Sequence, residues 1–246
     1  MSEPPDSQAE LQRLRAELEA ARDALGEFTY VVTHDLRAPL RHILAYSDLL
    51  REELGPRLQG EAAQFLETIG GAARLLARQI DGLKAWAQLE RAALQPAAVD
   101  AAALLAELRQ QLQPQAGGRA VQWDIATDLP ALQGDAALLR ELFAQLLGNA
   151  LKFTAPRAVA QIAVRALPAQ PGMATIEVRD NGVGYNPAQQ QRLFKVFQRL
   201  HGSAFDGLGL GLAMAQRIVQ RHGGAIAIEG APDAGCCVRV TLPRAG

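Results

Sequence analysis

Apolar residues recur in a heptad pattern near the start of the chain, and this pattern strongly restricts how the chain can fold. Successive members are three or four residues apart, with Glu and Arg between them: Leu11, Leu14, Leu18, Ala21, Leu25, Phe28 and Val32. Such spacing gives a helix one apolar seam, which a second helix must cover. The seam continues through Leu36 towards Ile43 and Leu50, so we expect a long helix paired with another helix.

A second run with similar spacing follows a break at Gly55, Pro56 and Gly60. Its apolar positions are Phe65, Ile69, Ala73, Leu76, Ile80, Leu83 and Ala87. Two long helices joined by a short break predict an antiparallel hairpin. A single hairpin has little against which to bury its stripe. We therefore expect a homodimer in which two hairpins form a four-helix bundle.

The pattern changes near Gln95-Pro96, where helices and strands begin to mix without strict alternation. The predicted helices are 100–112, 135–153 (capped by Asp135) and 208–222, and the predicted strands are 120–126, 161–167, 174–180, 225–229 and 237–242. This order predicts an α+β sandwich with helices on one face of one sheet.

Four segments follow from these patterns. Residues 1–9 are polar and are predicted to be disordered, and 10–27 are predicted to form a coiled-coil helix continuous with the next segment. Residues 28–95 form the helical domain and 96–246 the α+β domain. The seam before residue 32 would be suited to receive a signal from an upstream or separate sensor.

Composition excludes several classes of function. The formal net charge is −1, so no overall field favours nucleic acid. No stretch approaches 18 apolar residues and the N-terminus lacks a signal-peptide pattern, so we expect no membrane insertion and a cytoplasmic location. The two cysteines, Cys236 and Cys237, are adjacent, which excludes a disulfide framework and a cysteine-based zinc site.

His34 is the strongest candidate for chemistry in the first helix. It lies two residues from both Val32 and Leu36, which places it opposite the apolar seam. Pro39 removes the helical hydrogen bond to the carbonyl of Asp35 and is expected to kink the helix beside the imidazole. An imidazole can attack phosphorus when a carboxylate such as Asp35 holds its other N–H. A solvated surface histidine without a chemical role fits the spacing equally well.

The second domain carries two glycine-rich segments. Asp180-Asn-Gly182-Val-Gly184 follows a predicted strand, and Gly207-Leu-Gly209-Leu-Gly211 opens a predicted helix. Glycines there allow close backbone approach, and helix N-termini suit phosphate. A Rossmann fingerprint would need glycine at position 212, which is leucine, and no Gly-Lys-Ser/Thr P-loop occurs. Turns and caps alone would also account for the glycines.

Asn149 and Lys152 lie three residues apart on one face of an otherwise apolar helix. An amide oxygen together with phosphate oxygens suits Mg²⁺, and the lysine can neutralise phosphate charge. A solvated lysine on the helix surface is the alternative for Lys152.

Taken in order, these motifs resemble a sensor histidine kinase of two-component signalling. His34–Leu40 resembles the phospho-accepting box, and the other motifs resemble the N box (Leu146–Phe153), the G1 box (Asp180–Gly184), the F box (Phe194–Arg199) and the G2 box (Gly207–Gly211). The run Phe-Gln-Arg-Leu-His at 197–201 is most similar to the phytochrome-like subgroup.

The resemblance implies a dimerisation and phosphotransfer hairpin followed by an ATP-binding domain of Bergerat type. It implies that Asp180 accepts from the adenine amino group, that Asn149 holds Mg²⁺, and that Lys152 and Arg199 face phosphates. Phe197 falls in the same site, whose pocket and lid would be shaped by Gly182, Gly184, Gly207, Gly209 and Gly211. His34, assisted by Asp35, would take the γ-phosphoryl group of ATP and pass it to an aspartate in the receiver domain of a response regulator.

Three positions depart from the family pattern. Ala38 stands four residues after His34, where many relatives have Thr or Asn, so we expect little phosphatase activity. Gln145 stands four before Asn149, where kinases usually have Asn and hydrolytic relatives Glu. The lid before Gly207 is short, and Leu208 replaces a small hydroxyl residue, which could weaken nucleotide binding.

Two other functions compete with the kinase. A nucleotide-binding dimeric scaffold would keep the helical seam but transfer no phosphate, and the intact His34-Asp35 pair and Asn149 argue against it. An ATP-driven clamp like the topoisomerases would need a hydrolytic Glu where Gln145 stands.

Overall fold

A computed structural model shows two compact units, Met1–Ala92 and Ala93–Gly246. It describes the backbone of residues 5–200 and 205–246. Thirteen side chains within that part are outside the description: residues 5–8, 11, 15, 18, 19, 22, 23, 25, 28 and 30. Much of the predicted seam before Val32 therefore lies outside the described side chains. The boundary between the units falls close to the predicted change at Gln95-Pro96.

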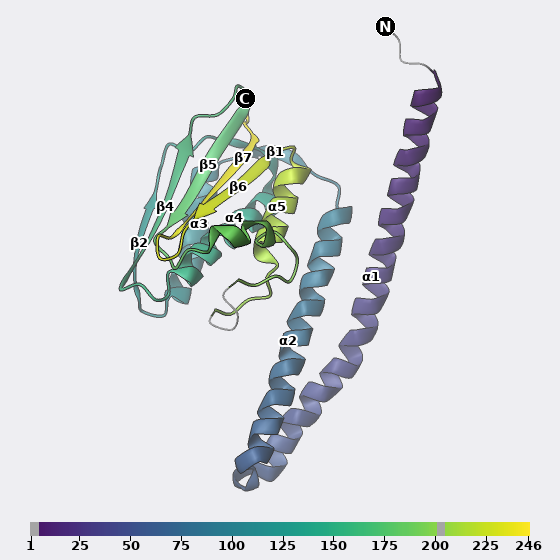
Figure 1. Cartoon of the computed structure of the whole chain (residues 1–246), viewed down its shortest axis with the longest axis vertical. Coiled ribbons are helices and arrows are strands. Elements are labelled where there is room, and N and C mark those ends of the chain that lie inside the picture. Colours follow the sequence, from purple (N-terminus) through teal and green to yellow (C-terminus); the bar gives the residue numbers. More distant parts are fainter. Residues whose placement is uncertain (1–4, 201–204) are drawn as a thin grey trace. The chain divides into compact units, whose positions relative to one another are not determined.

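The first unit is the predicted antiparallel hairpin. Helix α1 spans Pro5–Leu54 and α2 spans Gly60–Arg91, joined by the short 3₁₀ turn η1 (Gly55–Arg57), and the two helices run side by side above this turn (Figure 1). Helix α1 begins at Pro5, within the 1–9 segment that was predicted to be disordered, because proline is well tolerated in the first turn of a helix. Residues 1–4 lie outside the described part.

The interior of the hairpin is narrow and uses only part of the apolar surface. Leu40, Ala73 and Ile80 form its buried cluster, with Leu44 and Ala77 packed against it. The predicted seam had assigned Leu36, Ile43 and Leu50 to the helix contact, but these side chains are exposed within one chain. The inward positions of α1 are instead Thr33, Leu40 and Ser47, seven residues apart, because α2 covers the adjacent row of the heptad.

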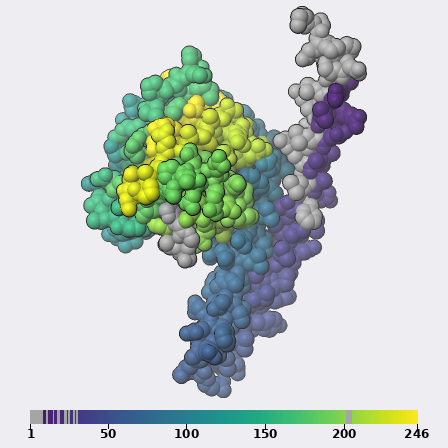
Figure 2. Space-filling model, viewed as in Figure 1, coloured from purple at the N-terminus to yellow at the C-terminus, as the bar shows by residue number. Residues whose placement is uncertain are grey.

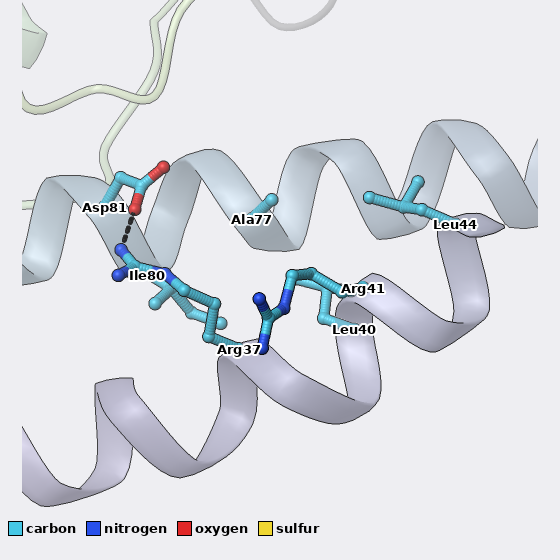
Figure 3. Close-up of a pocket in the computed structure, with 7 residues that line it drawn as sticks. All are labelled: Arg37, Leu40, Arg41, Leu44, Ala77, Ile80 and Asp81. Atoms are coloured by element: carbon cyan, nitrogen blue, oxygen red, sulfur yellow. Dashed lines mark hydrogen bonds and ion pairs between the residues drawn. The ribbon is translucent and has the colours of Figure 1, made fainter.

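A groove between α1 and α2 lies beside this cluster (Figure 3). Leu40, Leu44, Ala77 and Ile80 supply its apolar lining. At one end the guanidinium of Arg37 donates to the carboxylate of Asp81, so an ion pair ties α1 to α2 one turn beyond His34.

The second unit has the predicted α+β architecture. Its five-stranded sheet has the order β2-β4-β5-β7-β6, with α3, α4 and α5 on one face (Figure 1). The strands are β2 (Ala120–Ile125), β4 (Val159–Leu167), β5 (Met173–Asp180), β6 (Ala225–Gly230) and β7 (Cys236–Pro243), and the helices are α3 (Ala101–Leu112), α4 (Ala136–Phe153) and α5 (Gly211–Arg221). Among the described strands of this sheet, β2 and β4 pair in parallel and the other neighbours pair antiparallel.

Most predicted elements lie within three residues of their observed bounds, and Asp135 caps α4 as expected, accepting from the N–H groups of Ala137 and Leu138. Two short strands, β1 (Pro96–Val99) and β3 (Leu132–Asp135), were not predicted. They pair with each other in a separate sheet, and four-residue strands are too short for alternation to reveal them. The other 3₁₀ segments are η2 (Gln113–Ala116) and η3 (Pro187–Arg192).

Within 5–200 and 205–246, none of the helices combines the length and the hydropathy that a bilayer span requires.

His222 ties two elements of the second unit together. Its buried ring accepts the Asp135 N–H through Nε2 at 3.0 Å, and Nδ1 lies 2.8 Å from the Ile218 carbonyl. Because a carbonyl only accepts, Nδ1 carries the proton, and the neutral ring links the end of α5 to the start of α4.

We expect His222→Ala to lower the free energy of unfolding by about 2 kcal/mol, because it leaves the Asp135 N–H without its partner and opens a cavity. Urea unfolding of the full chain measures this loss. The exposed His42 provides the matched control, since His42→Ala removes the same ring from a helix surface. Equal stability of the two variants would contradict the assigned role.

Candidate functional site

His34 lies on the outer surface of α1, as the spacing predicted. Its side chain is 74% exposed, and Nδ1 lies 3.1 Å from Oδ1 of Asp35. Helix α1 continues through Pro39, so the proline removes one hydrogen bond without ending the helix. The Asp35 carboxylate favours a proton on Nδ1, which makes Nε2 the basic nitrogen.

In the second unit, Asp180 ends β5 and begins the first glycine-rich loop. Its Oδ1 accepts the Gly182 N–H at 2.8 Å. Burial raises the pKa of the Asp180 carboxyl to about 6, and hydrogen bonds from the backbone of Gly182 and Cys236 only partly oppose this rise. The group is thus a desolvated acceptor at the end of a central strand.

The loop after Asp180 needs glycine because other backbone lies very close. A Cβ on Gly182 would lie 2.7 Å from the Phe153 carbonyl oxygen, and one on Gly184 only 1.8 Å from that of Ala231. Gly184 also has φ of +63°, in the left-handed region. Since Val183 donates to the Phe153 carbonyl, this loop is joined to the end of α4.

Arg157 fixes the same loop, and the sequence analysis missed it. Its Nε donates to the Asn181 carbonyl and its Nη2 to the Gly182 carbonyl, both at 2.8 Å. Nη2 also lies 3.0 Å from the Asp233 carbonyl oxygen. No spacing rule could have found this arginine, because its partners are 24 to 76 residues away in the chain.

The polar face of α4 carries Asn149 and Lys152, both half-buried. Nζ of Lys152 lies 4.4 Å from the centroid of the Phe153 ring. Burial lowers the pKa of Lys152, and the nearby positive charge of Arg199 lowers it further, whereas Asp206 acts in the opposite direction. A partly desolvated ammonium with a neighbouring guanidinium provides a strong field for an anion.

The segment before α5 brings the second set of glycines to this face. A Cβ on Gly207 would lie 3.2 Å from Nζ of Lys152. Phe197 has an unusual φ of +61° and donates its N–H to the Gly209 carbonyl. Phe205 packs edge-on against Phe153, with 5.1 Å between ring centroids, and its carbonyl accepts from Arg199.

Two amide side chains of α4, Gln145 and Asn149, reach the start of α5. Helix α5 begins at Gly211, three residues later than predicted, and a Cβ there would lie 2.5 Å from Oε1 of Gln145 and 3.5 Å from Nδ2 of Asn149. In the described part of the chain no three His, Cys, Asp or Glu side chains gather as a metal site. Amide oxygens completed by phosphate oxygens and water suit Mg²⁺, so these residues fit that ion together with a nucleotide.

The structure thus brings most predicted residues into two groups. His34 and Asp35 lie together in the first unit. In the second unit the loop after β5, the end of α4 and the segment before α5 converge around Asp180, Asn149 and Lys152. Figure 2 shows the surface of the segment between β5 and α5, in green, against the yellow strands β6 and β7.

Comparison with known proteins agrees with this division. Residues 24–92 match the His Kinase A (phospho-acceptor) domain family, and residues 134–246 match the family of histidine kinase-, DNA gyrase B- and HSP90-like ATPases. The two matches together support a histidine kinase catalytic core built from these two domains.

Individual relatives match the chain across both units. The chain is 31% identical over 235 residues to cyanobacterial phytochrome B from Nostoc sp. (95% of this chain, 31% of the relative), and 33% identical over 233 residues to the sensor histidine kinase AruS of Pseudomonas aeruginosa (90% and 23%). It spans less than a third of these two curated relatives. The crystal structure of full-length ShkA in complex with AMPPNP covers 89% of the chain, which corresponds to 46% of ShkA, with a TM-score of 0.65 and 27% identity.

Proposed function

We propose that this chain is an ATP-dependent protein-histidine kinase that phosphorylates its own His34. The observation that carries the proposal is the exposed imidazole of His34, whose Nδ1 lies 3.1 Å from the Asp35 carboxylate on the outer face of α1. A buried histidine could not reach a phosphoryl donor, and one without a carboxylate would lack a group to hold its second N–H.

The second unit supports the proposal as the ATP-binding half. The desolvated Asp180 is an acceptor for the adenine amino group, and its neighbours Gly182 and Gly184 let the backbone approach the base. Lys152 and Arg199 face the phosphates, and Phe197, Gly207, Gly209 and Gly211 shape the segment that covers them. The nonhydrolysable ATP analogue AMPPNP is bound by the relative ShkA, which agrees with this assignment.

Asn149 would hold Mg²⁺ through its amide oxygen, with Gln145 beside it. The ion supplies charge neutralisation for the triphosphate. Side chains of the protein carry out the remaining steps. Nε2 of His34 attacks the γ-phosphorus of ATP in line with the departing ADP, while Asp35 holds Nδ1–H and stabilises the positive imidazolium that forms. Catalysis is then chiefly positioning and neutralisation of charge.

The surface of the hairpin supports a homodimer. Leu36, Ile43 and Leu50 on α1 and Phe65, Ile69 and Leu76 on α2 are exposed apolar side chains. A second hairpin would cover them as a four-helix bundle, which is the arrangement that the His Kinase A family suggests. Phospho-His34 would then pass its phosphoryl group to an aspartate on the receiver domain of a response regulator.

Incubation with γ-labelled ATP and Mg²⁺ tests the kinase. We expect label that is lost in acid and kept in alkali, as a phosphoramidate requires, and we expect none in His34→Gln. The exposed His42→Gln is the matched control and should keep its label. A chain that binds ATP but never becomes labelled would instead be a dimeric nucleotide-binding scaffold.

The raised pKa of Asp180 predicts that ATP binding depends on pH. The carboxylate is ionised above pH 6 and accepts from adenine, and as the pH falls through about 6 it takes a proton, loses its charge and becomes a weaker acceptor. Because one pH unit below the pKa leaves about a tenth of the group ionised, ATP affinity should fall by at most about tenfold between pH 7 and pH 5. Titration calorimetry measures this change.

Asp180→Asn separates this effect from the titration of ATP itself. The asparagine oxygen accepts at every pH, so this variant should bind more weakly but change only as the phosphates titrate. A parallel pH profile for the two proteins would contradict the role of Asp180.

We also propose that the chain has little phosphatase activity towards its regulator, because the methyl group of Ala38, four residues after His34, cannot position a water molecule. The unphosphorylated chain should leave the lifetime of a phosphorylated receiver domain unchanged, and Ala38→Thr should shorten it. Rapid dephosphorylation by the unaltered chain, abolished in Asp35→Ala, would contradict this proposal.

A further inference from the structure

Three polar side chains form a row along one face of α4. Glu141, Gln145 and Asn149 are four residues apart, so they follow one another up the same side of the helix, and all three are half-buried. Nε2 of Gln145 donates to Oε1 of Glu141 at 2.6 Å. The row ends at Asn149, the proposed Mg²⁺ ligand.

This hydrogen bond determines which way the Gln145 amide points. A carboxylate can only accept, so the amide must turn its NH₂ group towards Glu141. The reverse orientation would place two oxygens 2.6 Å apart, which is unfavourable in a partly buried site. The carbonyl oxygen of Gln145 is therefore directed to the other side, where it lies 2.5 Å from the position of a Cβ on Gly211.

The orientation matters because glutamine is a longer ligand than the asparagine common at this position. Three side-chain torsions allow its amide several directions, and only the oxygen can face a cation, since the NH₂ group would repel one. Asn149, one turn further along α4, reaches the same start of α5, with Nδ2 3.5 Å from the same Cβ position on Gly211, so its amide must turn over before its oxygen faces an ion there. The oxygen of Gln145 thus points to the region where Asn149 and the phosphates would meet an ion.

We propose that Glu141 is a positioning residue for the Mg²⁺·nucleotide site, which it serves by holding the carbonyl oxygen of Gln145 towards the ion. The inference rests on the proposed function, because it assumes that Mg²⁺ and nucleotide bind beside Asn149. Glu141 itself acts as an acceptor for the Gln145 amide and not as a ligand of the metal.

The test measures the Mg²⁺ dependence of AMPPNP binding to the full chain by calorimetry. We expect Glu141→Ala to raise the Mg²⁺ concentration for half-maximal binding about tenfold, similar to the loss seen when outer hydrogen-bond partners of metal ligands are removed. Binding of AMPPNP in excess chelator should not change, since the base and phosphate contacts are intact. Glu107→Ala removes an exposed carboxylate that pairs with Arg140 and is the control for lost charge.

Two further variants distinguish positioning from charge. Glu141→Gln keeps an oxygen that accepts from Gln145, so its Mg²⁺ requirement should remain within about twofold of the unaltered chain. If it loses as much as Glu141→Ala, the carboxylate acts by its charge and the proposal is wrong. In a Gln145→Ala background, Glu141→Ala should have no further effect, and a full additional loss would also overturn the proposal.

The unaltered chain separates this inference from the proposed function. If it shows no Mg²⁺-dependent AMPPNP binding, the proposed function fails and the inference with it. If it binds and Glu141→Ala does not alter the Mg²⁺ requirement, only the positioning role is overturned. Thermal melting of each variant confirms that it is folded.

Discussion

The burial of one face of α4 against the sheet is the constraint on which the nucleotide half of this protein depends. Leu139, Leu142, Phe143 and Leu146 are almost completely buried, and a helix with one face held in this way must direct its other face outwards. Glu141, Gln145 and Asn149 lie on that other face. The end of the same helix also anchors the loop after β5 through the Phe153 carbonyl, so one packing interaction places both the proposed metal ligands and the loop proposed to bind the base.

Local signals made much of this predictable. Asp135 and the apolar period after it predicted α4 with its cap, and the spacing around His34 predicted an exposed imidazole. What sequence could not supply were contacts between distant segments. Arg157 donates to three carbonyls that no local pattern connects to it. The proposed role of Glu141 depends on the hydrogen bond that Gln145 donates to it, which the sequence does not reveal. Short strands such as β1 and β3 exist because they pair with each other, not because their residues alternate.

The hairpin shows how a heptad pattern can be ambiguous when two helices share it. A helix with apolar residues at both repeating positions can turn either row inward. Here Leu40 faces α2 and Leu36 remains outside, although the predicted seam ran through Leu36 and did not include Leu40. The apolar side chains of α1 can therefore serve two contacts. One row packs against α2 within the chain, and the other is available to a second chain. The Arg37–Asp81 ion pair joins the two helices close to His34. A change in the relative register of α1 and α2 would therefore alter a contact near the imidazole.

The half-buried carboxylate of Asp180 at the end of β5, the proposed acceptor for adenine, also has a consequence for the choice between purine bases. Adenine offers an amino group at its six-position, whereas guanine has a carbonyl oxygen there. In this partly desolvated site that oxygen would face the lone pairs of Asp180, and polar groups left unmatched in such a site discriminate far more sharply than a difference in size. The raised proton affinity of the same group means that this discrimination against GTP should weaken in acid, where a protonated Asp180 could donate to the guanine carbonyl.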